Sequence, residues 1–334
     1  MITRLFLGMA ALLLGAGALC AQAPKPAPLE LTGNVAPAHD PAIIKDGGTY
    51  HVFTTGNLRD KEGLIGWRTS KDLKDWTLQQ SVFATIPDWA KAAIPGTGGL
   101  WAPDIIRVGN EFRLYYSVST FGKNRSAIGL ATTPTLDRTA PGFGWVDKGM
   151  VWESTARDDY NAIDPNIFID KDGRHWMSFG SFWTGIKLVE LDAATGKPLP
   201  GAKLTAIAGR SRPGAVEGPF IIERDGYHYL FASYDFCCRG VESTYYTVVG
   251  RSKAVTGPYV DRDGKAMMKG GGLLVLHADL DDGKRFVGPG HNSILREGGA
   301  DFIVYHAYDK REKGRPTLRI QRLDWTPDGW PVAL

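Results

Sequence analysis

The fold is decided by one stretch, Asp164-Pro-Asn-Ile167-Phe168, followed by the turn Asp172-Gly173 and the strand His175-Trp-Met-Ser-Phe179, because this pattern recurs along the chain. In each copy the first residue precedes an apolar pair, and a turn and an alternating, aromatic-rich run follow it. The five copies begin at Asp40, Ala102, Asp164, Glu217 and His291. Turns of the Asp-Gly, Gly-Asn and Gly-Gly type between extended segments are typical of β-hairpins. The sequence therefore predicts five copies of one hairpin unit.

Further alternating runs extend each hairpin toward a four-stranded unit. Several copies end in a closing aromatic residue, such as Trp76 or Trp330, and only residues 88–93 suggest a helix. Five units of roughly sixty residues, each with about four strands, are typical of an all-β, five-bladed β-propeller, here a single domain. A β-sandwich also holds many short strands, but it gives no reason for five copies of one pattern.

The composition is that of a globular protein. Of the 334 residues, 43% are hydrophobic and 22% are charged, which excludes a disordered chain. The net charge is +3, and the 39 Lys and Arg are scattered among 36 Asp and Glu. Because no basic run stands out, the sequence indicates no nucleic-acid partner. A closed propeller has no exposed edge strand, so we expect a monomer.

The first residues have the pattern of a secretory signal peptide. An apolar stretch from Leu5 to Leu19 follows Arg4 and precedes small residues and three prolines. We predict a signal peptide over residues 1–23, a Pro-rich segment over residues 24–36 and the propeller over residues 37–334. This organisation predicts a secreted or periplasmic protein with no membrane span in the mature chain. An N-terminal membrane anchor is the alternative for the same apolar run.

Cleavage near residues 20 to 23 leaves the mature chain with two cysteines, the adjacent Cys237 and Cys238. This number excludes a framework of several disulfides. In an exported chain the pair could form a vicinal disulfide. Two reduced, buried thiols are the alternative.

The geometry of a propeller brings the first positions of the five copies together. The first strand of each blade lines the central channel, so the first positions of the five copies converge near one axis. Three of these positions hold acids, at Asp40, Asp164 and Glu217. Acids in one pocket repel one another, which raises at least one pKa and leaves ionised and protonated carboxyls together, as general acid/base chemistry requires. Each acid alone could instead cap a turn, but three at one register favour a shared site.

Five motifs stand in order along the chain: His39-Asp40-Pro41, Trp101-Ala-Pro-Asp104, Asn161-Ala-Ile-Asp164-Pro165, Val216-Glu217-Gly-Pro219 and Gly288-Pro-Gly-His291. Together they resemble glycoside hydrolase family 43, from about residue 38 to the C-terminus. Three further motifs resemble the endo-α-1,5-L-arabinanases of that family: Ser181-Phe-Trp183, Phe236-Cys-Cys238 and Ser243-Thr-Tyr245. The resemblance implies an inverting glycosidase that cleaves internal bonds of arabinan or arabino-oligosaccharides.

The resemblance also implies a role for each acid. Asp40 matches the general base that activates a water, and Glu217 matches the general acid that protonates the leaving oxygen. Asp164 matches the third carboxylate, which raises the pKa of the acid and helps to hold it and the sugar. Inversion needs a gap of roughly 6.5–9.5 Å between base and acid. Positions on the first and fourth blades leave room for such a gap.

Substrate contacts are expected from amides, and from flat aromatic rings that stack on sugars. Asp40 and Asp164 belong to this surface, and Trp101 is a stacking candidate beside the axis. Phe121 and Trp183 follow second strands, in loops where binding residues collect. The family pattern adds the remaining candidates: Gly122, Asn161, Ala162, Ile163, Ser181 and Phe182.

His291 resembles the family histidine that holds calcium or a similar cation in the channel. One imidazole is an unusual ligand for a hard ion, so such a site would depend largely on water. The alternative is a channel histidine without a metal. No organic cofactor is indicated.

Two other functions use the same features. An exo-acting α-L-arabinofuranosidase or β-xylosidase of the family would share the acids and differ in the loops that close the groove. A propeller that only binds carbohydrate would need aromatics but no converging acids. The three acids at one register argue against this last alternative.

Overall fold

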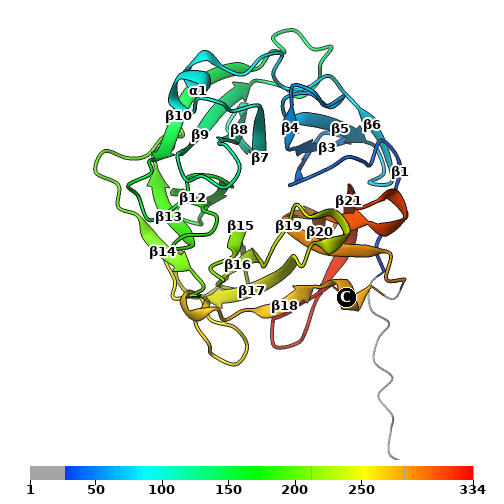
Figure 1. Cartoon of the computed structure of the whole chain (residues 1–334), viewed down its shortest axis with the longest axis vertical. Coiled ribbons are helices and arrows are strands. Elements are labelled where there is room, and N and C mark those ends of the chain that lie inside the picture. The colour runs from blue at the N-terminus through cyan, green and yellow to red at the C-terminus, as the bar shows by residue number, and fades with distance from the viewer. Residues whose placement is uncertain (1–26, 212, 282, 334) are drawn as a thin grey trace, which may run out of the picture.

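The computed structural model describes residues 27–211, 213–281 and 283–333. Five sheets stand around a central axis, and this arrangement confirms the predicted five-bladed β-propeller (Figure 1). The predicted signal peptide lies outside the described residues. No helix in the described part of the chain is long and apolar enough to span a membrane.

The blades follow one another along the chain. Blade one contains β2 (Ala42–Asp46), β3 (Thr49–Thr54), β5 (Gly66–Ser70) and β6 (Asp75–Leu78), and blade two contains β7 (Gly99–Val108), β8 (Glu111–Val118), β9 (Ser126–Thr133) and β10 (Val146–Ser154). Blade three contains β11 (Asn166–Ile169), β12 (His175–Phe179), β13 (Ile186–Leu191) and β14 (Thr205–Ala208). Blade four contains β15 (Val216–Arg224), β16 (Tyr227–Tyr234), β17 (Tyr246–Ser252) and β18 (Leu273–Leu276). Blade five contains β19 (Phe286–Glu297), β20 (Ala300–Asp309), β21 (Arg315–Trp325) and β22 (Pro331–Val332).

Short elements complete the ring. Strand β1 (Thr32–Gly33) pairs with the outer strand of blade one, and β4 (Gly56–Asn57) joins β7 of blade two, so these two sheets have five strands. The helix α1 covers Asp88–Ala93, as predicted. The 3-10 helices are η1 (Gly240–Glu242), η2 (Met267–Lys269), η3 (Ala278–Leu280) and η4 (Lys310–Glu312).

The repeated apolar pair forms the inner hairpin of each blade. In blade one Ile43 lies opposite Val52, and in blade three Ile167 lies opposite Met177. Successive side chains of a strand point to opposite faces of a sheet. Both faces of these strands are therefore buried between neighbouring blades, where the apolar and aromatic residues form the cores.

Polar side chains connect neighbouring blades near the axis. The carboxylate of Asp104 in blade two accepts a hydrogen bond of 2.6 Å from the amide of Ile167 in blade three. The side-chain oxygen of Asn166 accepts one of 2.8 Å from the amide of Ile221 in blade four. These links hold the inner strands of consecutive blades at a fixed offset.

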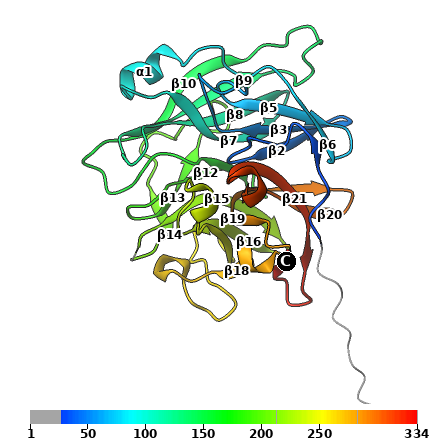
Figure 2. The same cartoon turned by 45° about the vertical axis from the view of Figure 1, so that its right-hand side comes forward.

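The ring closes where the N-terminal segment runs along the last blade (Figures 1 and 2). The amide of Ala38 donates to the carbonyl of Pro316, and the amide of Leu318 donates to that of Val35, each over 2.9 Å. Gln321 of β21 forms a β-bridge with Pro28, and its side-chain amide donates to the carbonyl of Ala333. The two ends of the described chain therefore meet at one residue.

Candidate active site

Next to the axis, each inner segment has one residue with an unusual backbone conformation. The φ angle is positive at Asp40 (53°), Ala102 (40°), Asp164 (60°) and His291 (50°), and in blade four at Gly218 (58°). Gly218 is thus the structural equivalent of Asp40, and the sequence-based placement of Glu217 in this set is wrong by one residue. The error arose at the apolar pair Phe220-Ile221, in which Ile221, and not Phe220, occupies the position that Ile43 has in the first copy.

At each of these positions the backbone amide donates a hydrogen bond to a side chain. The amide of Asp40 donates to Nδ1 of His306, that of Asp164 to Oγ of Ser117, and that of Gly218 to a carboxylate oxygen of Asp164. The amides of Ala102 and His291 donate in the same way to hydroxyls of Thr55 and Ser233. A positive φ in a non-glycine residue costs free energy and persists where its surroundings hold it. The backbone that presents the acids is therefore fixed by contacts between blades.

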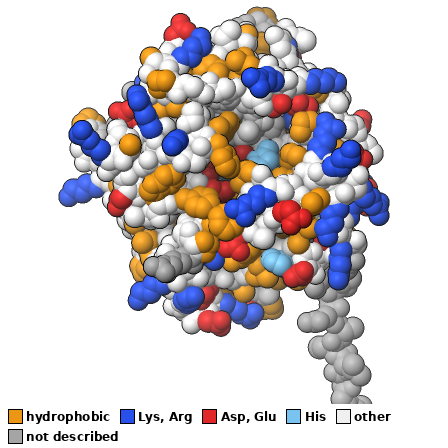
Figure 3. Space-filling model, viewed as in Figure 1, with side chains coloured by type: hydrophobic (Ala, Val, Ile, Leu, Met, Phe, Trp, Pro, Cys, Tyr) orange, Lys and Arg blue, Asp and Glu red, His pale blue; other side chains and the backbone are white. Residues whose placement is uncertain are grey.

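The three predicted acids are brought together. Asp40, Asp164 and Glu217 are each 7–8% exposed, and the pKa values of Asp164 and Glu217 respond to the other acids. Figure 3 shows acidic and histidine side chains at the bottom of a central hollow on this face. The three acids therefore lie close together around the axis.

Asp40 is surrounded by hydrogen-bond donors. Its Oδ1 lies 2.8 Å from Nδ1 of His39 and 3.0 Å from Nδ1 of His291. Its Oδ2 accepts a hydrogen bond of 2.5 Å from the hydroxyl of Thr55. Burial favours the neutral carboxyl, but the two histidines outweigh burial and hold the pKa of Asp40 well below its usual range. Asp40 is therefore ionised at neutral pH.

The other two acids are shifted in the opposite direction. Burial raises the pKa of Glu217, and Asp40 adds to this shift, although the Ser181 hydroxyl donates to Oε2 of Glu217 over 2.6 Å and opposes it. Burial and the charges of Glu217 and Asp40 also raise the pKa of Asp164, to about 8. The site therefore holds a carboxylate with a lowered pKa beside two carboxyls with raised pKa values.

His291 lies on the axis next to Asp40. Burial lowers the pKa of its imidazole, but the charges of Asp40, Asp164 and Glu217 outweigh burial and raise this pKa to about 9. Since Nδ1 faces Asp40, a cation could bind only at Nε2, and only after the imidazole has lost its second proton. Within the described ranges, no group of three or more close metal-ligating side chains includes His291. A cation at this nitrogen would therefore need water for most of its ligands.

The predicted substrate residues differ in their access to solvent. Phe121 and Trp183 are 80% and 42% exposed, while Ser181 is buried against Glu217. Ala162 is fully buried in the core between blades two and three. Three further candidates, Trp101, Gly122 and Phe182, are partly buried or exposed, and two, Asn161 and Ile163, are buried.

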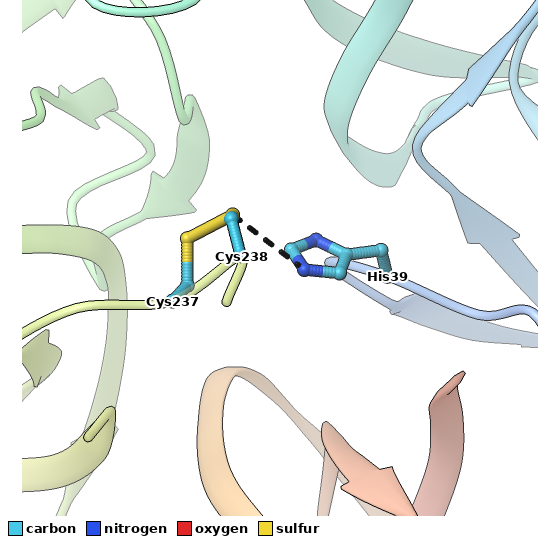
Figure 4. A group of neighbouring side chains, drawn as sticks. All are labelled: His39, Cys237 and Cys238. Atoms are coloured by element: carbon cyan, nitrogen blue, oxygen red, sulfur yellow. Dashed lines mark hydrogen bonds between the residues drawn. A yellow bond between two sulfur atoms is a disulfide. The ribbon is translucent and has the colours of Figure 1, made fainter. Parts of the chain in front are cut away.

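Phe182 packs against Phe236, with ring centroids 5.9 Å apart, at the start of the loop that carries the cysteines. Cys237 and Cys238 form a disulfide, one of the two alternatives that the sequence left open. The Sγ of Cys238 lies 3.9 Å from Nε2 of His39 (Figure 4). The disulfide loop is therefore part of the site wall.

Sequence reasoning missed several residues of the site. Asp40 contacts His39 and Thr55 directly, and His39 in turn contacts Tyr308. Tyr245 is buried near all three acids. The motif His39-Asp40-Pro41 was the one available signal for His39. No local pattern points to Thr55 or Tyr308, because each reaches the site from the end of a second strand.

A separate cavity of about 580 Å³ lies at the opposite ends of the inner strands of blades three to five. Asp170, Arg224 and Arg296 are among its lining residues, and none of the three acids is. The clustered acids, and not this cavity, therefore mark the candidate active site.

A model of glycosyl hydrolases family 43 matches residues 35–331. The chain is 45% identical over 296 residues to the extracellular endo-alpha-(1->5)-L-arabinanase 1 of Bacillus subtilis, covering 88% of this chain and 86% of that protein. It is 44% identical over 305 residues to the extracellular exo-alpha-(1->5)-L-arabinofuranosidase ArbA of Cellvibrio japonicus, with coverages of 88% and 85%. The structure of Cellvibrio cellulosa alpha-L-arabinanase complexed with arabinohexaose has a TM-score of 0.82 at 43% identity, covering 88% of this chain and 94% of that chain.

Proposed function

The chain belongs to glycosyl hydrolase family 43 and is an arabinanase, and on this premise we propose that it cleaves internal α-1,5-L-arabinofuranosidic bonds with inversion. Asp40 is the general base and Glu217 is the general acid. The observation that supports these roles is the opposite shift of two carboxyl pKa values within one buried pocket. Such a pair separates the proton acceptor from the proton donor.

In this reaction the sugar lies over the hollow with its glycosidic oxygen near Glu217. The protonated Glu217 donates to that oxygen while the ionised Asp40 takes a proton from the attacking water. Asp164 accepts the amide of Gly218, the residue after Glu217, over 3.2 Å, and so positions the segment that carries the acid. Phe121 and Trp183 supply exposed rings for stacking on flanking arabinose units.

A cation at His291 is part of the proposal. Calcium or a similar ion bound at Nε2, with water as its other ligands, would add positive charge below the acids. Asp40 at Nδ1 would orient the ring for this role, as carboxylates often do for metal-binding histidines.

Export of the protein also belongs to the proposal. Two relatives are named extracellular, and the signal-like residues 1–23 agree with release into the medium or periplasm. We further propose that the enzyme acts as a monomer, because a propeller leaves only short, protected strand edges.

The product pattern on debranched α-1,5-arabinan tests the cleavage mode. An endo enzyme releases a broad series of intermediate oligosaccharides at the earliest times, as followed by chromatography. Monomer or one short product from the start would instead assign the chain to the exo mode that the Cellvibrio relative is named for. Proton NMR of the first product gives its anomeric configuration, and a product with the retained configuration would refute inversion.

A further inference from the structure

A chain of hydrogen bonds leads from the disulfide loop to Asp40. The backbone amide of Cys238 donates to the hydroxyl oxygen of Tyr308 over 2.7 Å, and this oxygen lies 2.7 Å from Nε2 of His39. Nδ1 of His39 lies 2.8 Å from Oδ1 of Asp40. All these residues except Asp40 are absent from the catalytic scheme above.

The Asp40 end gives the chain its direction. A carboxylate can only accept, so Nδ1 of His39 carries the proton that faces Oδ1 of Asp40, and Nε2 of the neutral imidazole accepts the phenol proton of Tyr308. The Tyr308 oxygen is still able to accept the amide of Cys238. A neutral imidazole that accepts at Nε2 carries its own proton on Nδ1. His39 then donates to Oδ1 of Asp40.

The ring of His39 is held in place by packing. It stacks on His306 with ring centroids 3.8 Å apart and an interplanar angle of 25°. Nδ1 of His306 in turn accepts the backbone amide of Asp40 over 3.1 Å. The imidazole is therefore fixed relative to both the backbone and the carboxylate of Asp40.

The donors around Asp40 also select one of its oxygens. A carboxylate offers about four acceptor positions, two on each oxygen. His39 and His291 occupy those of Oδ1, while Thr55 occupies one on Oδ2. With the donors that the described chain supplies, the free position is on Oδ2, where an attacking water can bind.

We propose that His39 and Tyr308 are positioning residues, in which Tyr308, anchored by the Cys238 amide, holds the His39 tautomer that fixes Oδ1 of Asp40 and directs Oδ2 toward water. This inference rests on the proposed role of Asp40 as general base. It adds to the active site a pair of residues from the first and last blades that need not touch the sugar.

Two replacements of His39 separate positioning from packing. The amide nitrogen of an asparagine can take the place of Nδ1, whereas the longer glutamine side chain reaches toward the position of Nε2. We expect His39→Gln to lower kcat on debranched arabinan by about 10- to 100-fold, as for a lost hydrogen bond to a charged group, with KM nearly unchanged. His39→Asn should restore kcat to within a few-fold of the unchanged enzyme.

A second substitution tests the tautomer itself. Tyr308→Phe should lower kcat by about 10-fold in the unchanged protein. In the His39→Asn background the same change should have almost no effect, because an asparagine amide donates without a fixed tautomer. Tyr305→Phe is the matched control, since Tyr305 is buried on the same strand and its hydroxyl donates to Gln321; it should leave kcat unchanged.

Equal losses for the Asn and Gln variants, or an equal cost of Tyr308→Phe in both backgrounds, would overturn the inference. Thermal unfolding midpoints of all variants identify any change that acts through the fold. Asp40→Asn is measured in parallel. If that variant stays active, the proposed function itself fails. If Asp40→Asn is inactive but the His39 and Tyr308 variants keep the kcat of the unchanged enzyme, only the positioning role of these two residues is refuted.

Discussion

The two sides of the active site start from the same kind of residue and end with carboxyl pKa values shifted in opposite directions. Asp40 and Glu217 are both buried carboxyls, 8% exposed. Asp40 accepts hydrogen bonds from two histidines and a threonine hydroxyl. Glu217 accepts one from the hydroxyl of Ser181, and the charge of His291, which lowers its pKa, is opposed by that of Asp40. Burial disfavours charge on both sides, so the neighbouring groups decide the direction of each pKa shift. The comparison shows that the groups around each buried acid, and not burial alone, set the direction in which its pKa shifts.

The largest effect should come from removing either member of this pair, with a different signature for each. Glu217→Gln should lower kcat/KM on arabinan by about 10²- to 10⁴-fold, because leaving-group protonation is lost. On an aryl arabinobioside with a good leaving group the loss should be much smaller. Asp40→Asn should lose similar factors on both substrates, because the water still needs a base. An equal loss of kcat/KM for Glu217→Gln on arabinan and on the aryl substrate would contradict different roles for Glu217 and Asp40.

A smaller effect should follow when the hydrogen bond to Glu217 is removed. The general acid works while protonated, so activity falls as pH rises through its raised pKa, which sets the alkaline limb of the kcat/KM profile. Ser181 stabilises the ionised form, so Ser181→Ala should raise the pKa further and move this limb to higher pH, by up to about one unit. Ser119→Ala, which changes a buried serine bonded to Ser126, is the control. A limb that stays in place or moves to lower pH would contradict the acid assignment.

The smallest effect should come from a residue that belongs to neither side. Trp183→Ala should raise KM for arabinan by about 2- to 10-fold with kcat little changed, as expected for one lost stacking contact. The factor should be the same for both leaving groups. Leu274→Ala is a control of similar exposure, 44% against 42%, on the outer strand of blade four. If Trp183→Ala lowered mainly kcat, Trp183 would act on the general acid Glu217 and not through stacking on the substrate.

Local signals were enough to predict the blades. Hairpins such as β15 and β16 join at Asp225-Gly226, and β19 and β20 join at Gly298-Gly299, at the predicted turns. Turn residues and alternation act over a few positions, so one sequence reveals them. The added strands β1 and β4 were not predicted, because each depends on a partner strand far along the chain.

The candidate site was only partly predictable for a related reason. The repeat led to Asp40 and Asp164 correctly but placed Glu217 in the backbone position that Gly218 occupies. His39 and Tyr308 are 269 residues apart and meet only because the first and last blades are neighbours. Contacts of this kind follow from closure of the ring, which no local pattern encodes.

Gln321 holds Pro28 on one side and Ala333 on the other, so the described polypeptide begins and ends at the same point of a closed ring. The blades have a cyclic order, and the opening between Pro28 and Ala333 is one choice among several. A gene rearranged so that these ends are joined and the chain is reopened in an exposed loop between two other blades would encode the same circle of contacts. The architecture is thus compatible with circular permutation, which would place Asp40 and Glu217 at new distances along the chain without changing their separation in space.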